Sequence, residues 1–145
     1  VEVGGEMRFS GTKPDQVAWR IAIENPDSTS RSVFRILEIS VGAVATSGDY
    51  RNFFEVDGQR YSHTINPKTG YPVAHDLASV TVVSPLCIDA DAYATAFMAM
   101  GREAALSLAE SKNLAVLLIY KEGASFRSVQ SSQFTAQFGL FETNI

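Results

Sequence analysis

The sequence predicts an α+β fold in which a largely antiparallel, mixed sheet packs against a pair of helices. Three observations predict it. Short β-rich runs separated by turn signals fill the first half, a run of β-branched residues follows at 78–84, and helical segments occupy 88–100 and 102–112. Hydrophobic residues make up 46% of the 145 residues and charged residues 19%, which is ordinary for a single globular domain.

The first half is expected to consist of strands joined by turns. Residues 1–9 alternate around Gly4-Gly5, and a glycine pair inside a strand is typical of a bulge or a close backbone approach. Asp57-Gly58 between two β-rich runs predicts a hairpin over 53–63. The other elements expected here are turns at 11–15 and 45–50, strands at 19–24 and 34–41, and a loop at 66–70.

The second half is expected to hold the core strand and the helices. The β-branched residues at 78–84 predict a strand that is covered on both faces. Gly101 separates the two predicted helices, and shorter strands are expected at 114–120, at 126–129 and near Phe138. The apolar residues expected to face inward from the first helix are Ile88, Ala92, Ala96 and Ala99.

Composition narrows the class of partner. The net charge is −4 with no basic run, which argues against nucleic acid, because such binding needs clustered Lys and Arg. The one cysteine, Cys87, cannot form an internal disulfide, and no apolar run is long enough to span a bilayer. Alternation is already under way at Val1, so we expect the chain to continue a longer protein.

Asp91 and Thr95 form the first candidate site. Helical residues four apart lie on one face with Cβ atoms about 6 Å apart, and a carboxylate and a hydroxyl are hard oxygen ligands that suit Mg²⁺. Asp91 is expected in the first helical turn, where a metal would hold a pyrophosphate against backbone amides. The alternative is structural: Asp89 and Asp91 cap the helix, and Thr95 bonds back to a carbonyl.

Two polar segments are further candidates. His63 is expected at the end of a strand before a polar loop, where an imidazole acts either as an acid or base near neutral pH or as a structural donor. Residues 46–50 offer backbone N–H groups and hydroxyls that would contact a phosphate or a flavin, or else form a plain turn. His75 has no evident partner and is assigned no role.

Several segments occur in the order typical of one family. They are 3–6 (VGGE), 19–26 (WRIAIENP), 47–50 (SGDY), 62–70 (SHTINPKTG), 79–83 (SVTVV) and 91–95 (DAYAT). Together they resemble the ApbE-type FAD:protein FMN transferases, also called thiamine biosynthesis lipoproteins, from the first residue to about Tyr120. The resemblance implies an ApbE-like, T-fold-related domain of which residues 1–145 form the C-terminal portion, incomplete without the family's N-terminal half.

The resemblance also implies an activity. Such enzymes bind FAD with Mg²⁺ at the pyrophosphate, a Thr or Ser hydroxyl of an acceptor flavoprotein attacks the FMN phosphorus, and AMP leaves. The site residues implied by position are the metal ligands Asp91 and Thr95, the base His63, and the nucleotide contacts Thr64, Ile65, Ser47 and Gly48.

The sequence departs from the family pattern at two positions. Asn66 stands where the commoner loop has Asp, which removes a negative charge beside His63, and Ala94 stands where some members carry a second carboxylate. The family's N-terminal half would supply the aromatic residue that stacks on the flavin, a lysine segment near the nucleotide and a carbonyl for the metal. The resemblance therefore implies only part of a complete site.

Partners and location follow from the resemblance alone. The expected acceptors are flavoprotein subunits of membrane redox complexes, and the intact protein is expected to be lipid-anchored at the periplasmic face of the inner membrane. Two alternatives stay open. In one, water replaces the acceptor hydroxyl, which gives FAD pyrophosphate hydrolysis. In the other, the domain is a non-catalytic flavin-binding or interaction module.

Overall fold

The computed structural model describes residues 1–26, 32–49, 53–56 and 59–141. Its main sheet has six strands in the order β1-β2-β5-β8-β9-β10, and every neighbouring pair is antiparallel. The α+β fold class with a largely antiparallel sheet is therefore confirmed. The strands are β1 (Glu2–Val3), β2 (Glu6–Phe9), β5 (Gly42–Gly48), β8 (Leu77–Ser84), β9 (Ala115–Glu122) and β10 (Ser125–Gln130).

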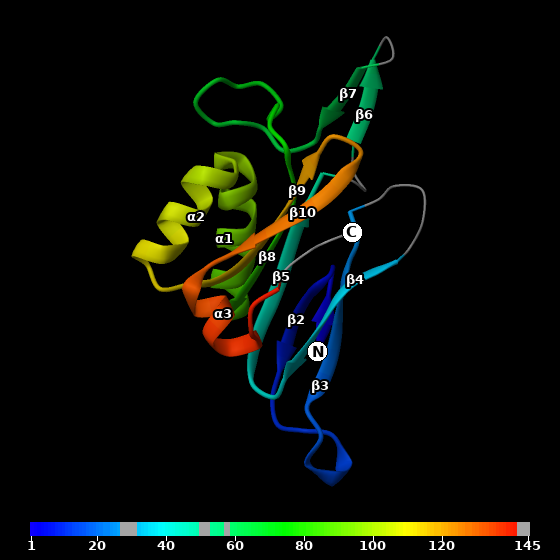
Figure 1. The fold of residues 1–145 in the computed structure, drawn as a ribbon, viewed down its shortest axis with the longest axis vertical. Helices are drawn as coiled ribbons and strands as arrows, with labels where there is room; N and C mark the ends of the chain where they lie inside the picture. Colours follow the sequence, from blue (N-terminus) through cyan, green and yellow to red (C-terminus); the bar gives the residue numbers. More distant parts are fainter. Residues whose placement is uncertain (27–31, 50–52, 57–58, 142–145) are drawn as a thin grey trace.

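Different elements cover the two faces of this sheet (Figure 1). The helix pair α1 (Cys87–Met100) and α2 (Arg102–Ser111) packs on one face. The ribbon of β3 (Trp19–Glu24) and β4 (Val33–Ile39) packs on the other face together with α3 (Ser132–Phe138). A second ribbon, β6 (Phe53–Val56) and β7 (Gln59–Ser62), projects beyond the sheet, and η1 (Pro14–Gln16) is a short 3-10 turn. Asp57-Gly58, which was expected to close the second ribbon, lies outside the described residues.

The strand β8 forms the centre of the core. All of its residues are buried, as its β-branched composition predicted. Val80 and Val82 belong to the cluster on the helix face, and Val83 belongs to the cluster on the ribbon face. Ser79 and Thr81 alternate with Val80 and Val82 along the strand, yet these polar side chains are buried too, because both faces of the sheet are covered.

The first nine residues form a hairpin, so the single strand expected there is wrong. Val3 lies opposite Glu6 in an antiparallel pair, and Gly4 and Gly5 form the turn with φ angles of 67° and 108°. Two successive positive φ angles match a two-residue hairpin turn, which glycine adopts without steric cost. The glycine pair therefore reverses the chain where a bulge was expected.

Residues 45–50 were expected to form a turn, but through Gly48 they continue β5, and Tyr50 lies outside the described residues. Thr46 lies opposite Thr81 of β8, and their hydroxyls are 2.9 Å apart. The polar composition reflects the surroundings of this strand end, because residues 46–48 leave the core and border a cavity. In the sequence, the small polar residues of a strand that borders a cavity have the same composition as a turn.

The buried face of α1 differs from the expected one. The residues that enter the core are Ala90, Ala94, Phe97 and Met98, whereas Ile88 is 75% exposed. Alanine surrounds the helix on all sides, so apolar spacing alone did not identify the packed face. Among the described residues, each helix lacks the length or the apolarity of a membrane span.

The segment near Phe138 is helical, so the strand expected there is wrong. Ser131 caps α3, since its side chain accepts a hydrogen bond from the Phe134 backbone N–H at 3.2 Å. Phe134 and Phe138 are four residues apart and pack with their ring centroids 4.9 Å apart. The serine cap and the aromatic spacing are both helical signals.

Candidate functional site

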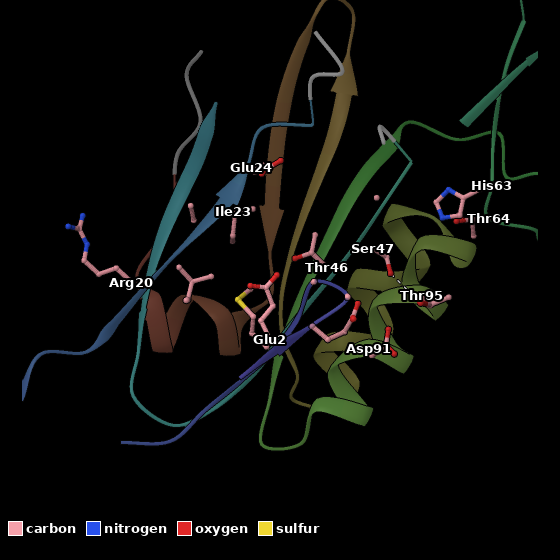
Figure 2. Close-up of a pocket in the computed structure, with 17 residues that line it drawn as sticks. Glu2, Arg20, Ile23, Glu24, Thr46, Ser47, His63, Thr64, Asp91 and Thr95 are labelled. Carbon is pink, nitrogen blue, oxygen red and sulfur yellow. Dashed lines mark hydrogen bonds between the residues drawn. The ribbon is translucent and has the colours of Figure 1, made fainter. Parts of the chain in front are cut away.

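A cavity of about 600 Å³ lies beside the end of β5 (Figure 2). Within the described part of the chain, residues 43 and 44 pair with both β2 and β8, but residues 46–48 pair with β8 alone. The turn at Gly4-Gly5, the strand β3, the helix α1 and the residues after β7 complete the wall. The volume falls in the range of small-molecule sites.

The structure brings most of the residues singled out in the sequence to this cavity. Ile65 is the exception, since it does not line the wall and is 48% exposed. The residues that do line it are Ser47, Gly48, His63, Thr64, Asp91 and Thr95. They come from β5, α1 and the loop after β7, so the fold assembles them from three separate segments.

Asp91 and Thr95 face the cavity from α1. They are one helical turn apart and both are exposed. Thr95 Oγ1 lies 3.2 Å from Ser47 Oγ, and Figure 2 shows this contact across the gap between α1 and β5. The contact orients the hydrogen of whichever hydroxyl donates, and it links the Thr95 oxygen to β5.

The start of α1 corrects one expectation about Asp91. The N-cap is Leu86, which makes no side-chain cap hydrogen bond, and Asp89 is the acidic residue of the first turn. Asp91 lies beyond that turn, so its carboxylate is not at the helix terminus. The capping interpretation of Asp91 therefore does not hold, and its position on the cavity wall needs another reason.

The loop after β7 places His63 and Thr64 on the cavity wall. Ser62 is buried, and its Oγ accepts a hydrogen bond from the Thr64 backbone N–H at 3.1 Å. Asn66 Oδ1 accepts from the Lys68 N–H at 2.9 Å, which is an Asx turn. An aspartate would make the same bond, so Asn66 preserves the loop despite its different charge.

Ala94 does not belong to the cavity wall. Its side chain is fully buried in the core cluster between α1 and the sheet. A carboxylate at this position would have to enter that apolar layer, at a considerable desolvation cost. In this fold the alanine therefore removes no ligand from the cavity.

Several lining residues were not singled out from the sequence. Figure 2 places Arg20 at the end of the cavity opposite His63. The carboxylates on the wall, besides Asp91, are those of Glu2, Glu6 and Glu24. The segments at 3–6 and 19–26 contain Glu6, Arg20 and Glu24, but strand alternation does not separate a side chain that faces a cavity from one that faces water.

The charges of the wall decide which ligands fit. Among the described residues, four carboxylates and a single arginine line the cavity, so an added cation would favour the binding of an anionic ligand. Within the described residues, no group of three or more His, Cys, Asp or Glu side chains is placed to hold a metal. Asp91 and Thr95 nevertheless suit Mg²⁺, which is bound by one or two carboxylates together with water and phosphate oxygens.

Comparison with known proteins identifies close relatives. A model described as the ApbE family matches residues 1–118. A FAD:protein FMN transferase of Vibrio cholerae serotype O1 is 49% identical over 134 residues, which cover 92% of this chain and 40% of that protein. The protein of the same name from Escherichia coli K12 is 42% identical over 134 residues, with 92% and 38% covered.

Solved structures agree with the sequence comparison. The crystal structure of the Pseudomonas stutzeri flavinyl transferase ApbE in its apo form superposes with a TM-score of 0.82 at 42% identity. The match covers 97% of this chain and 43% of that one. The chain therefore spans about two fifths of the length of the relatives it matches.

Proposed function

The chain belongs to the ApbE family, and we propose from this that it carries the metal-binding and acceptor-activating part of an FMN transferase site. In the proposed reaction, FMN moves from FAD to a Thr or Ser hydroxyl of an acceptor flavoprotein, and AMP is released. One observation carries the proposal. Asp91 and Thr95 on α1 and His63 after β7 line one cavity of about 600 Å³.

His63 is proposed as the base. The acceptor oxygen forms a bond to the FMN phosphorus as the bond from that phosphorus to the bridging oxygen breaks. AMP leaves with the electron pair, and the hydroxyl proton passes to the imidazole of His63. His63 lies on the cavity wall beside Thr64 and opposite Arg20. This position supports the proposal that the acceptor hydroxyl reacts at the end of the cavity where His63 lies.

Asp91 and Thr95 are proposed to hold Mg²⁺. When bound, the ion neutralises charge on the pyrophosphate and positions it. The acidic wall supports this role, because phosphate oxygens beside four carboxylates would otherwise be repelled. The negative carboxylate of Asp91 would attract the ion. The hydroxyl of Thr95 would offer it an oxygen ligand, which lies in contact with the Ser47 hydroxyl.

The remaining wall is proposed to contact the nucleotide. Thr64, Ser47 and Gly48 face the cavity, so each is placed to touch the flavin or the phosphates. Ile65 is also proposed as a nucleotide contact, and its position outside the wall limits it to the rim. Mutation of Thr64 is therefore expected to weaken FAD binding more than mutation of Ile65.

The acceptors are proposed to be flavoprotein subunits of membrane redox complexes. Lipid anchoring of the intact protein at the periplasmic face of the inner membrane is proposed with them, on family resemblance alone. Fractionation of cells that express the intact protein tests the location. Recovery with cytosolic markers would contradict it.

The first experiment is the intact mass of an acceptor flavoprotein domain incubated with FAD, Mg²⁺ and this chain. We expect a gain of one FMN that disappears with EDTA and in Asp91→Ala. Asp89→Ala is the matched control, because Asp89 lies on the same helix but outside the cavity. Its product is expected to match that of the unmodified chain.

If the acceptor domain gains no FMN, a second form of the protein is assayed. The chain would then be joined to the part of the Vibrio cholerae relative that it does not cover, and the assay repeated. Failure of both forms would overturn the transferase proposal. Flavin binding without Mg²⁺ dependence would then favour a non-catalytic module, and release of free FMN and AMP would favour FAD hydrolysis.

A further inference from the structure

The second histidine, His75, joins the loop after β7 to the helix α1. Its Nε2 lies 2.8 Å from the backbone oxygen of Met98, in the last turn of α1. A carbonyl oxygen only accepts, so Nε2 carries the proton and donates it. The other ring nitrogen, Nδ1, is buried and has no partner among the described residues.

This hydrogen bond serves a helix end. The last carbonyls of a helix lack partners within the helix, and His75 satisfies one of them from 23 residues away in the sequence. The ring also packs on Gly101, whose φ is +82°. A Cβ at Gly101 would lie 3.1 Å from His75 Cδ2, so a larger residue would strain the backbone at this φ and would also press on the ring.

The residue after His75 strengthens the attachment. The Asp76 carboxylate lies 3.1 Å from Arg102 Nη2 at the start of α2. The Arg102 guanidinium in turn lies over the ring of Tyr120, 3.9 Å from its centroid. The Asp76 backbone oxygen accepts from the Lys121 N–H at 2.8 Å, so the loop is attached both to the helix junction and to β9.

The same loop end is bonded to the cavity residues. Val73, two residues before His75, donates its N–H to the Thr64 backbone oxygen at 3.0 Å. On the other side of the contact, Met98 follows Thr95 by three residues in one continuous helix. A helix is stiff over this distance, about 1.5 Å of rise per residue. His75 therefore connects the two walls of the cavity through a short bonded path.

We propose that His75 is a positioning residue that sets the separation between His63 and Thr64 on the loop and Asp91 and Thr95 on α1. It touches neither ligand nor reacting atoms, since it does not line the cavity. Its kinetic consequence rests on the function proposed above. The anchoring of the loop by His75 does not depend on that function.

The test replaces the donor and then restores it. His75→Leu removes the hydrogen bond and keeps an apolar side chain, and His75→Gln returns an amide N–H near the position of Nε2. The matched control is Ser111→Ala, which removes a bond of similar kind at the end of α2, where Ser111 Oγ donates to the Leu108 oxygen at 2.9 Å.

The first readout is amide hydrogen exchange at Val73, measured by NMR on the chain without any ligand. In His75→Leu we expect exchange at Val73 to accelerate about tenfold, because the loop opens more often. In His75→Gln it should return to within about threefold of the unmodified chain, and Ser111→Ala should not change it.

The second readout is FMN transfer, with the form of the protein found active in the preceding assay. We expect His75→Leu to lower kcat about tenfold or more, with a smaller change in the KM for FAD, because displaced groups impair the transition state most. His75→Gln should restore kcat. Gly101→Ala, which presses on the ring, should reproduce the loss.

The outcomes separate the two proposals. If His75→Leu only lowers the melting temperature and leaves Val73 exchange and kcat unchanged, His75 is structural and the inference is overturned. If His75→Gln restores neither readout, hydrogen-bond donation is not its role. If neither the chain nor the joined form transfers FMN, the function proposal fails, and exchange at Val73 alone then decides whether the loop is anchored.

Discussion

The two ends of β5 lie in different surroundings. Residues 42–45 are buried: Ala43 and Val44 pair with a strand on each side, and Ala43 and Ala45 join the core under α1. Residues 46–48 pair on one side only among the described residues, and they border the cavity. One strand thus belongs both to a packed layer and to a wall. The difference teaches that neighbouring strands, rather than the strand itself, decide whether a segment contributes to stability or to a site.

The packed layer and the cavity wall extend this contrast across the molecule. The layer consists of β8, β9 and the inner face of α1, whose core side chains are almost completely buried. The wall consists mainly of polar residues and glycines, together with Met7 and residues 21–23, from segments that meet at the end of β5. We therefore expect substitutions in the layer to change the free energy of unfolding, and substitutions in the wall to change ligand binding.

Phe97→Ala tests the packed layer with the largest expected effect. Phe97 is fully buried and stacks on Tyr93 with centroids 5.5 Å apart. Removing its ring should lower the free energy of unfolding by about 3–5 kcal/mol, measured by urea denaturation. Ile88→Ala on the same helix should cost less than about 0.5 kcal/mol, because that side chain is exposed. Equal losses would contradict the observed orientation of α1.

The packed layer was the part that the sequence predicted well. The β-branched run at 78–84 predicted β8 to within one residue, and the alanine-rich and amphipathic segments predicted α1 and α2. The valines between Ser79 and Ser84 identified the strand, because β-branched residues favour a pleated, covered sheet. The paired spacing of Asp91 and Thr95 could also be read in advance, because helical periodicity alone places them on one face.

The cavity wall was predicted less well for a physical reason. Residues 45–50 have turn composition, yet their hydrogen bonds to β8 make them a strand as far as Gly48. The contributions of Arg20 and Glu24 depend on how the ribbon packs across the sheet, which local patterns do not encode. His75 was also missed, because its partner Met98 is 23 residues away.

Ser131→Ala tests a polar part of the packed layer. Ser131 is completely buried, and its Oγ donates to the Leu114 oxygen at 2.6 Å and accepts from the Val116 N–H at 3.0 Å. Removing it leaves buried backbone groups without partners, so we expect a loss of about 2 kcal/mol in urea denaturation. The neighbouring Ser132→Ala is the control. It removes a contact of 3.1 Å from Ser132 Oγ to Glu110 Oε1, but Ser132 is exposed and water replaces the lost partner, so the loss should stay below about 0.5 kcal/mol. A loss no larger than that of the control would count against burial as the cause.

Gly5→Ala tests the wall. The φ of Gly5 is +108° and no other atom lies within 4 Å of an added Cβ, so backbone strain is the only cost. We expect a loss of about 1 kcal/mol in the free energy of unfolding. Gly123→Ala carries a similar strain at the turn between β9 and β10, away from the cavity. Flavin affinity, measured by fluorescence titration, should fall in Gly5→Ala only. A fall in both variants would mean that global destabilisation, not the wall, controls binding.

Ser47→Ala and Thr46→Val compare neighbouring hydroxyls on the wall, with the smallest expected effects. Thr46→Val leaves the buried hydroxyl of Thr81 without its partner, so about 1 kcal/mol should be lost in urea denaturation. Ser47→Ala should cost less than about 0.5 kcal/mol, because Thr95 is exposed and water replaces the lost partner. Titration with Mg²⁺ should show the reverse order, since Ser47 constrains the proposed ligand Thr95 and Thr46 does not. If Thr46→Val weakened Mg²⁺ binding as much as Ser47→Ala, the hydroxyl contact between β5 and α1 would have no specific part in holding the ion. The comparison of Thr46 with Ser47 would then not support a division of β5 into a packed end and an end that serves the cavity.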